Sequence, residues 1–194
     1  RMIRINLVHR IARCCFAVLG VCCLTTLAHA DEIYTQTFDD SDAGFVEMLF
    51  NPGASDNAEN SGPWTWGPTG VAGTNAWSIV GGNGGSNPYE QLLTSPEITV
   101  TGDGPVLMEF DHAFQFEEDW DGGVVMISIN DSPLEPLTNF VSNGYNDEMQ
   151  TGSDWGYEGS MNGLPMFSID SGGFIHSVAD LGILSAGDTI ELQF

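Results

Sequence analysis

The chain has 194 residues and a formal net charge of −23 at neutral pH, because 27 Asp and Glu residues stand against four Lys and Arg. Nucleic acids and anionic membrane surfaces are disfavoured as partners, since both bind basic patches. The sequence is rich in Asn, Ser, Asp and Gly, with 24 Gly, and no window shows a sustained helical period of apolar residues. The composition therefore predicts an all-β fold.

Residues 1–30 have the pattern of a secretory signal peptide. The cationic residues come first, and an apolar run follows that ends in Ala28-His29-Ala30, a small-x-small cleavage pattern. The run is shorter than the roughly 20 residues that span a bilayer. We expect cleavage after Ala30 and a mature chain that is secreted or held at the cell surface, without membrane insertion. The cations and cysteines of this segment are Arg1, Arg4, Arg10, Arg13, Cys14, Cys15, Cys22 and Cys23.

The mature part, residues 31–194, keeps all 27 acidic residues and has no Lys, Arg or Cys. Its length of about 164 residues is enough for one domain with a single core. Disulfides cannot stabilise it, and its self-repulsion requires cations from solution that screen or bind the carboxylates. The last apolar alternation reaches Phe194, which predicts a domain that is truncated at its C-terminus and lacks its last strands.

Alternating apolar residues predict a series of short strands separated by turns rich in Gly, Pro and Asn. The expected strands cover residues 33–38, 44–50, 76–80, 92–100 with a break at Ser95-Pro96, 135–141, 174–181 and 189–194. Residues 51–75 and 142–163 are expected to be loops. The length of the second loop favours a functional or ion-ordered segment.

The stretch Pro105–Asp131 is expected to be the centre of the fold. Residues 106–117 alternate between apolar and polar side chains, as in a long half-buried strand, and Val125, Ile127 and Ile129 share one parity in a second strand. Between the two strands lies the sequence Glu117-Glu118-Asp119-Trp120-Asp121-Gly122-Gly123. We interpret it as the turn of a hairpin that joins them.

This turn carries four carboxylates and no cation, which predicts a bound Ca2+ ion. Calcium takes about six to eight oxygen ligands in irregular geometry, and the turn offers Glu117, Asp119 and Asp121. Asp39, with Asp40 beside it, completes the predicted site if the first strand lies next to the hairpin. The alternative is a solvated acidic turn without a specific ion.

Residues 31–194 show no catalytic motif. His112 and His176 are the histidines of this part, and His112 shares the apolar parity of its strand, which favours a hydrogen-bonded core histidine. A zinc protease requires the paired histidines of His-Glu-x-x-His, and an ordered Ser/His/Asp arrangement requires a motif such as Gly-x-Ser-x-Gly. The sequence therefore predicts that the protein is not an enzyme.

Trp64 and Trp66 have matching parity within the loop of residues 51–75. Loop aromatics on a β-sandwich can form a platform on which a sugar ring stacks, which gives a carbohydrate-binding hypothesis. The alternative is that both rings pack over the end of a sheet, since aromatic side chains bury large areas.

Several short motifs, in this order, resemble a family of secreted bacterial jelly-roll domains. They are Phe38-Asp39, the Trp77 strand, Leu93-Thr94-Ser95-Pro96-Glu97-Ile98, the acidic turn Glu117 to Gly123, Val125 to Asn130, Tyr157-Glu158-Gly159, and Asp180-Leu181 before Ala186-Gly187-Asp188. The family is the MAM-like domain appended to immune-inhibitor-A-type metallopeptidases, together with the related cleaved-adhesin domains. The resemblance implies a two-sheet jelly-roll β-sandwich with a structural calcium ion. The final strands of such domains, with a closing Trp-x-x-Asp-like segment, are absent here.

The leading hypothesis is a secreted, non-catalytic β-sandwich module, stabilised by calcium. It would serve adhesion or positioning through a cell-surface protein or a glycan. The alternatives are a fragment of a secreted, metallopeptidase-linked hydrolase and a carbohydrate-binding module. The lack of a metalloprotease motif in these residues favours the first hypothesis.

Overall fold

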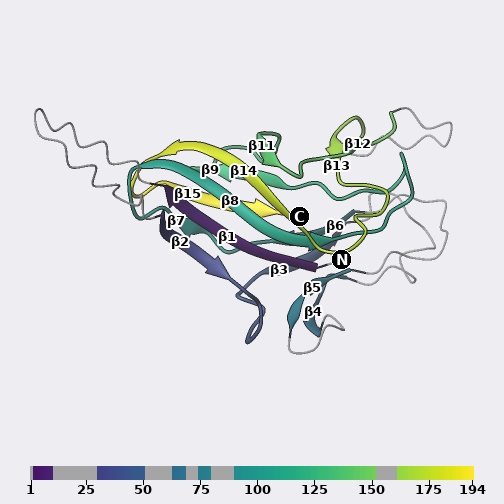
Figure 1. The fold of residues 1–194 in the computed structure, drawn as a ribbon, viewed down its shortest axis with the longest axis horizontal. Coiled ribbons are helices and arrows are strands. Elements are labelled where there is room, and N and C mark those ends of the chain that lie inside the picture. The colour runs from purple at the N-terminus through teal and green to yellow at the C-terminus, as the bar shows by residue number, and fades with distance from the viewer. Residues whose placement is uncertain (1, 11–29, 51–62, 69–73, 80–89, 152–160) are drawn as a thin grey trace, which may run out of the picture.

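The computed structural model describes residues 2–10, 30–50, 63–68, 74–79, 90–151 and 161–194. Within these ranges the chain forms strands, turns and bends and no helix, which confirms the predicted all-β fold. Most of the strands belong to two antiparallel sheets, which Figure 1 shows lying over each other.

The larger sheet has seven strands and the smaller has six, and we name them sheet A and sheet B. Sheet A runs in the order β11-β14-β8-β1-β5-β4, with β2 also paired to β1, and sheet B in the order β10-β9-β15-β6-β3, with β7 paired to β15. The strands of sheet A are β1 (Met2–Arg10), β2 (Ala30–Gln36), β4 (Thr65–Pro68), β5 (Asn75–Ser78), β8 (Gly104–Ala113), β11 (Phe140–Ser142) and β14 (Ile175–Leu184). Those of sheet B are β3 (Val46–Phe50), β6 (Glu90–Thr94), β7 (Ile98–Thr99), β9 (Met126–Ile129), β10 (Glu135–Pro136) and β15 (Thr189–Gln193). A separate two-stranded ladder pairs β12 (Asp147–Glu148) with β13 (Pro165–Met166).

The two sheets bury their facing sides in one hydrophobic core. Residues of β8 alternate, with Val106, Met108 and Phe110 buried and their neighbours partly exposed, because successive side chains of a strand point to opposite faces. Ile190 and Leu192 of β15 are buried in the same cluster. Side chains of both sheets thus share a single core, as in a β-sandwich.

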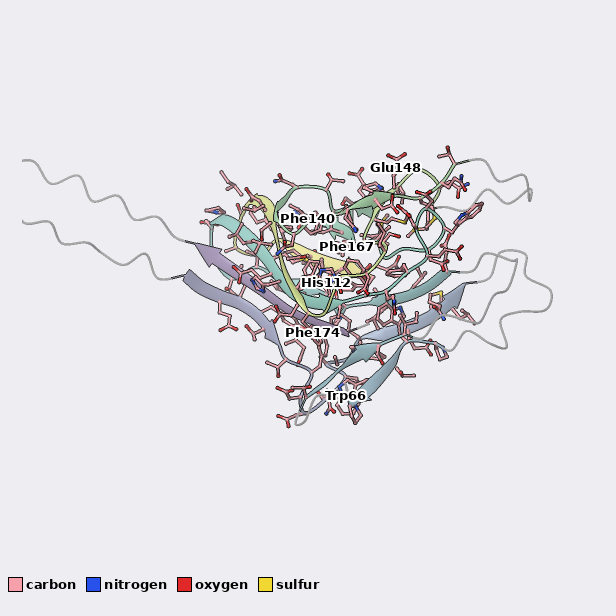
Figure 2. The ribbon with its side chains drawn as sticks, turned by 45° about the vertical axis from the view of Figure 1, so that its right-hand side comes forward. Trp66, His112, Phe140, Glu148, Phe167 and Phe174 are labelled. Carbon is pink, nitrogen blue, oxygen red and sulfur yellow. The ribbon has the colours of Figure 1, made fainter. Side chains whose placement is uncertain are left out.

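Aromatic rings fill the centre of this core. The Phe110 ring centroid lies 6.3 Å from that of Phe140 and 6.2 Å from those of Phe167 and Phe194. The His112 ring belongs to the same cluster, with its centroid 4.5 Å from that of Phe167. Figure 2 shows His112, Phe167 and Phe140 gathered in the middle of the molecule. The cluster joins the two sheets, because Phe110 and Phe140 belong to sheet A and Phe194 follows β15 of sheet B.

β1 lies inside sheet A. It pairs with β8 over Met2–His9, and on its other side it pairs with β2 over Ile5–Arg10 and with β5 at Ile3. β1 therefore connects the β11-β14-β8 part of sheet A with β2 and with the β5-β4 pair. Its residues belong to the predicted signal peptide. Cleavage after Ala30 stays a prediction, and residues 11–29 lie outside the described part of the chain.

The predicted hairpin between Pro105 and Asp131 is wrong. β8 belongs to sheet A, whereas β9 lies in sheet B between β15 and β10. Apolar alternation indicates that a strand buries one face, and strands of both sheets bury one face in the same core. Residues Glu117–Gly123 are therefore a crossover between the sheets and not the turn of a hairpin.

The other predicted strands are mostly confirmed. The break at Ser95-Pro96 is present, because β6 ends before it and β7 begins after it. The single strand predicted for residues 135–141 is wrong, since β10 and β11 are separate and lie in different sheets. The predicted loops contain short strands, β4 in the first and β12 in the second. Residues 152–160, which include the Tyr157 motif, lie outside the described residues.

Candidate functional site

The acidic loop, Glu117–Gly123, closes as a tight turn between the sheets. The Glu117 carbonyl accepts hydrogen bonds from the amides of Trp120 (3.3 Å) and Asp121 (3.0 Å). Asp119 has a φ of 66°, a left-handed conformation that Asp adopts more readily than most residues. The four acidic residues of the loop are exposed. Their charge is therefore directed to solvent while their backbone is held in place.

A second acidic segment holds this loop. The Asp119 amide donates to Asp147 Oδ2 over 3.1 Å, and the Gln150 amide donates to the Asp119 carbonyl over 3.0 Å. Hydrogen bonds from the backbone amides of Glu148 and Asp119 lower the pKa of Asp147, because they stabilise its charged form. The carboxylate of Asp147 thus binds the backbone of the acidic loop. Asp147 was not predicted as a site residue, because its only signal in the sequence is the run Asn146-Asp147-Glu148 inside a long polar loop.

The base of the loop packs closely on the chain around β13. Gly123 and Phe167 exchange two backbone hydrogen bonds of 2.9 and 2.8 Å, and Ser168 Oγ donates to the Asp121 carbonyl over 2.9 Å. A Cβ atom at Gly122 would overlap the Met166 side chain, whose Cβ and Cγ would lie at 2.8 Å. Gly122 therefore permits an approach that any side chain would prevent.

The structure does not bring Asp39 to the acidic loop. Asp39 lies beside the β4-β5 pair, where the Asn75 side chain donates to its carbonyl over 2.7 Å. Figure 2 shows Trp66 of β4 and Glu148 of β12 on opposite sides of the molecule. The three other predicted ligands stay together in the loop. Across the described ranges, no group of three or more His, Cys, Asp or Glu side chains is arranged to hold a metal ion.

The two tryptophans of the proposed sugar platform lie in different environments. Trp64 is only 8% exposed, and its Nε1 donates to the Gln91 carbonyl of β6 over 3.0 Å. Trp66 is 38% exposed, and its Nε1 donates to the Phe38 carbonyl over 2.8 Å. The Trp64 ring thus packs in the core, while the Trp66 ring reaches solvent. The two rings do not form one exposed stacking surface.

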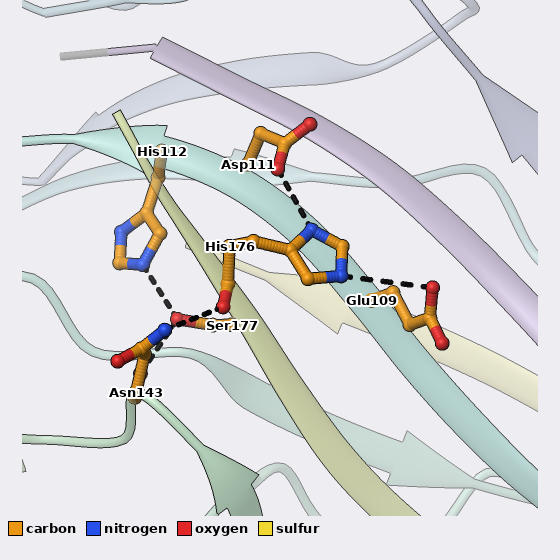
Figure 3. A network of polar contacts seen from close by, with 6 residues as sticks. All are labelled: Glu109, Asp111, His112, Asn143, His176 and Ser177. Carbon is orange, nitrogen blue, oxygen red and sulfur yellow. Dashed lines mark hydrogen bonds and ion pairs between the residues drawn. The ribbon is translucent and has the colours of Figure 1, made fainter. Parts of the chain in front are cut away.

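A buried polar network surrounds His112 (Figure 3). His112 Nε2 lies 2.8 Å from Ser177 Oγ, and Ser177 Oγ donates to the Asn143 carbonyl over 2.6 Å. A serine hydroxyl has one hydrogen, so the second contact requires that His112 Nε2–H donate to Ser177. Burial lowers the pKa of His112 to about 4, with the Asp111 charge acting weakly in the opposite direction.

This geometry assigns His112 a structural role. A catalytic base would accept the hydrogen of the serine, but here the imidazole donates to Ser177 and the serine hydrogen is directed to Asn143. Ser177 is also fully buried, so no substrate reaches its hydroxyl. The predicted hydrogen-bonded core histidine is confirmed.

His176 lies on the outer face of sheet A between two carboxylates, as Figure 3 shows. Its Nδ1 lies 2.8 Å from Asp111 Oδ1 and its Nε2 lies 3.7 Å from Glu109 Oε2. The ring is 50% exposed, so such a pair contributes about 0–1 kcal/mol when the imidazole is charged. This cluster could not be predicted from the sequence, because it depends on the register that sets His176 of β14 opposite Asp111 of β8.

Comparisons with protein-family models, with curated proteins and with solved structures found no match. No helix within the described residues is long and apolar enough to cross a membrane. The function must therefore be inferred from the geometry of this chain.

Proposed function

We propose that the protein is an exported, non-catalytic β-sandwich module that serves adhesion or positioning at a cell surface, and that calcium stabilises it. The two sheets around one core support this role. The hydrogen bonds of His112 and Ser177 support a non-catalytic role, because both side chains are bonded to other groups inside the core. A jelly-roll topology of the MAM-like type is part of the proposal, and the short motifs of the sequence support it.

The observation that carries the binding role is the exposed apolar edge of sheet B. Among the strands that the structure describes, β3 is the last of that sheet and pairs with β6 on one side. Val46 and Met48 of this strand are 64% and 54% exposed. An edge strand of this kind offers both backbone groups and apolar surface to another molecule. β3 is therefore the proposed contact surface for a cell-surface protein or a glycan.

The substitution Met48→Lys tests the β3 surface. It places a charge on the edge, so the binding of the purified protein to the producing cells should weaken by at least about ten-fold. Ile183→Lys is the matched control, because Ile183 is 83% exposed and belongs to β14 of sheet A. Equal binding of both variants and the unmodified protein would exclude β3 as the contact. A glycan array measured with the same proteins separates a glycan partner from a protein partner.

Calcium is proposed at the acidic loop because two acidic segments are hydrogen-bonded to each other there. Glu117, Asp119 and Asp121 would supply oxygen ligands, and Asp147 reaches the same loop through the Asp119 amide. The loop carboxylates are exposed, so their rotation toward an ion would disturb no core packing. Residues 31–194 contain no Lys or Arg, so the counterions of this cluster must come from solution.

Thermal unfolding in calcium tests this site. At a calcium concentration about 100 times Kd, binding to the folded state adds about 2.7 kcal/mol, which raises Tm by roughly 5–10 °C. Sodium at equal ionic strength is the control for screening. Asp121→Asn should remove most of the shift, whereas Asp131→Asn, in the exposed turn after β9, should keep it. An equal Tm in calcium and in sodium would leave only screening.

A further inference from the structure

β1 lies between β8 and β2 in sheet A and joins them. β8 pairs with β14 on one side and with β1 on the other, and β2 pairs with β1. Without residues 2–10, Val106–Ala113 of β8 and Glu32–Gln36 of β2 would each lose this neighbour. We call the position between β8 and β2 the β1 slot.

We propose that export turns the β1 slot into a strand-acceptor site, which an extended segment of a partner polypeptide fills in the mature protein. This proposal rests on the proposed export, because cleavage after Ala30 removes Met2–Arg10. An empty slot would leave one side of β8 without ladder partners and would remove the pairing that holds β2 in the described part of sheet A, which is costly. Addition of a strand restores this pairing and gives main-chain affinity.

The register of β1 defines the apolar pattern of the occupant. Directly opposed residues of an antiparallel pair lie on the same face of the sheet. Ile5 stands opposite Phe110 and Leu7 opposite Met108, and both β8 side chains are buried. Alternate positions of the slot therefore belong to the core face. The partner segment needs apolar residues at these positions, as the sequence of β1 has.

The outer face beside the slot defines the charge of the occupant. Glu109 and Asp111 of β8 lie on this face together with His176. A cation at the strand position opposite Asp111 would be stabilising, and in the sequence of β1 this position is Arg4. Residues 31–194 contain no Lys or Arg, so a second copy of the mature chain cannot provide this cation. Charge complementarity therefore favours a different polypeptide that carries Lys or Arg at the outward position.

A peptide-binding experiment tests the slot. The full chain, with a specific protease site inserted in residues 11–29, is folded, cut, and separated from its excised N-terminal segment in urea before the urea is removed. The probe is a labelled peptide of residues Met2–Arg10, and its binding is followed by fluorescence anisotropy. Hydrogen exchange of Val106–Ala113 reports whether β8 is paired. We expect saturable binding that protects these amides, including the case in which the cut protein unfolds and refolds on addition of the peptide.

Peptide variants test the two faces of the slot. Ile5→Asp, at the position opposite the buried Phe110, should weaken binding by more than roughly 100-fold, because a carboxylate is costly on the face of the sheet that belongs to the core. Arg4→Glu, opposite Asp111, should weaken binding by roughly five-fold at low salt and less at high salt. Asn6→Ser, at the position opposite Glu109, is the control and should bind unchanged. Absence of peptide binding, or equal binding of the Ile5→Asp peptide, overturns the acceptor slot.

The protein recovered from the producing cells separates this inference from the proposed export. A chain that begins at Asp31 and is bound to a second polypeptide supports both. A chain that begins at Asp31, stays monomeric and has a protected β8 overturns the partner strand alone, since a segment of the same polypeptide would then fill the slot. A chain that retains Met2–Arg10 overturns export and, with it, the opening of the slot.

Discussion

A decrease of pH from 7 to 5 should destabilise the protein through His112. Burial holds its pKa at about 4 in the folded state, against 6.5 for an exposed histidine. Between these values the unfolded chain binds a proton that the folded chain does not. The stability that the neutral His112 contributes is therefore fully present above pH 6.5 and is lost as the pH falls toward 4. The two pKa values give a loss of about 2 kcal/mol at pH 5 and about 3 kcal/mol below pH 4.

Urea unfolding of the wild type and of His112→Gln at pH 7 and pH 5 measures this loss. Gln keeps an N–H that can donate to Ser177 and removes the titrating ring, while the 27 carboxylates are common to both proteins. Between pH 7 and pH 5, the wild type should lose about 2 kcal/mol more unfolding free energy than the His112→Gln variant does. His176→Gln, which removes the other histidine of residues 31–194, shows how much of the change is specific to His112. A His112→Gln difference that is the same at both pH values would refute the buried, neutral histidine.

Two further predictions concern packing, and urea unfolding measures both. Gly122→Ala should lower the unfolding free energy by about 1–3 kcal/mol, because its Cβ would overlap Met166. Gly123→Ala meets ordinary van der Waals contacts and should cost less, and equal losses would contradict the close approach at Gly122. Phe110→Ala should cost about 3–5 kcal/mol, since Phe110 is 2% exposed at the centre of the aromatic cluster. Phe174→Ala is its control, with Phe174 47% exposed and an expected loss within about 0.5 kcal/mol.

Apolar alternation is enough to predict strands but not their partners. β8 and β15 follow the prediction because each buries one face, with Phe110 and Leu192 on the core side. The same alternation is present on β9, which lies in sheet B although β8 lies in sheet A. Two facing sheets give identical patterns, so the choice between a hairpin and a crossover depends on how the sheets close around the core. A single sequence does not contain that information in its periodicity.

The acidic loop could be located from the sequence, but its neighbours could not. Asp147 reaches Asp119 from 28 positions along the chain, and His176 reaches Asp111 from 65. Both contacts depend on strand register and on the path of the crossover. The choice of Asp39 as a fourth ligand required the first strand to lie beside a hairpin, and that hairpin does not form.

Several carboxylates of this acidic chain have a local structural role. Asp42, Asp170 and Asp180 each accept a hydrogen bond of 2.7–3.0 Å from the amide of the glycine two residues later. Asp188 accepts bonds from the Ser185 amide and the Asn130 side chain, and these bonds lower its pKa. Such turns use Asp as an internal acceptor. The acidic composition is thus partly a result of turn chemistry, and net charge alone does not indicate an ion.

The case for calcium therefore depends on where separate acidic segments meet. In the turns, an aspartate such as Asp42 accepts a hydrogen bond from an amide of its own segment. Asp147 also accepts from the amide of its neighbour Glu148, but its other oxygen accepts from Asp119 in a second acidic segment. In the acidic loop, Asp147 brings a second segment to within a hydrogen bond of Asp119, and charges accumulate in space as well as in sequence. Calcium stabilisation should accordingly be lost with Asp121→Asn or Asp147→Asn and be kept with Asp42→Asn. A calcium shift that falls equally in all three variants would indicate general screening of the acidic surface.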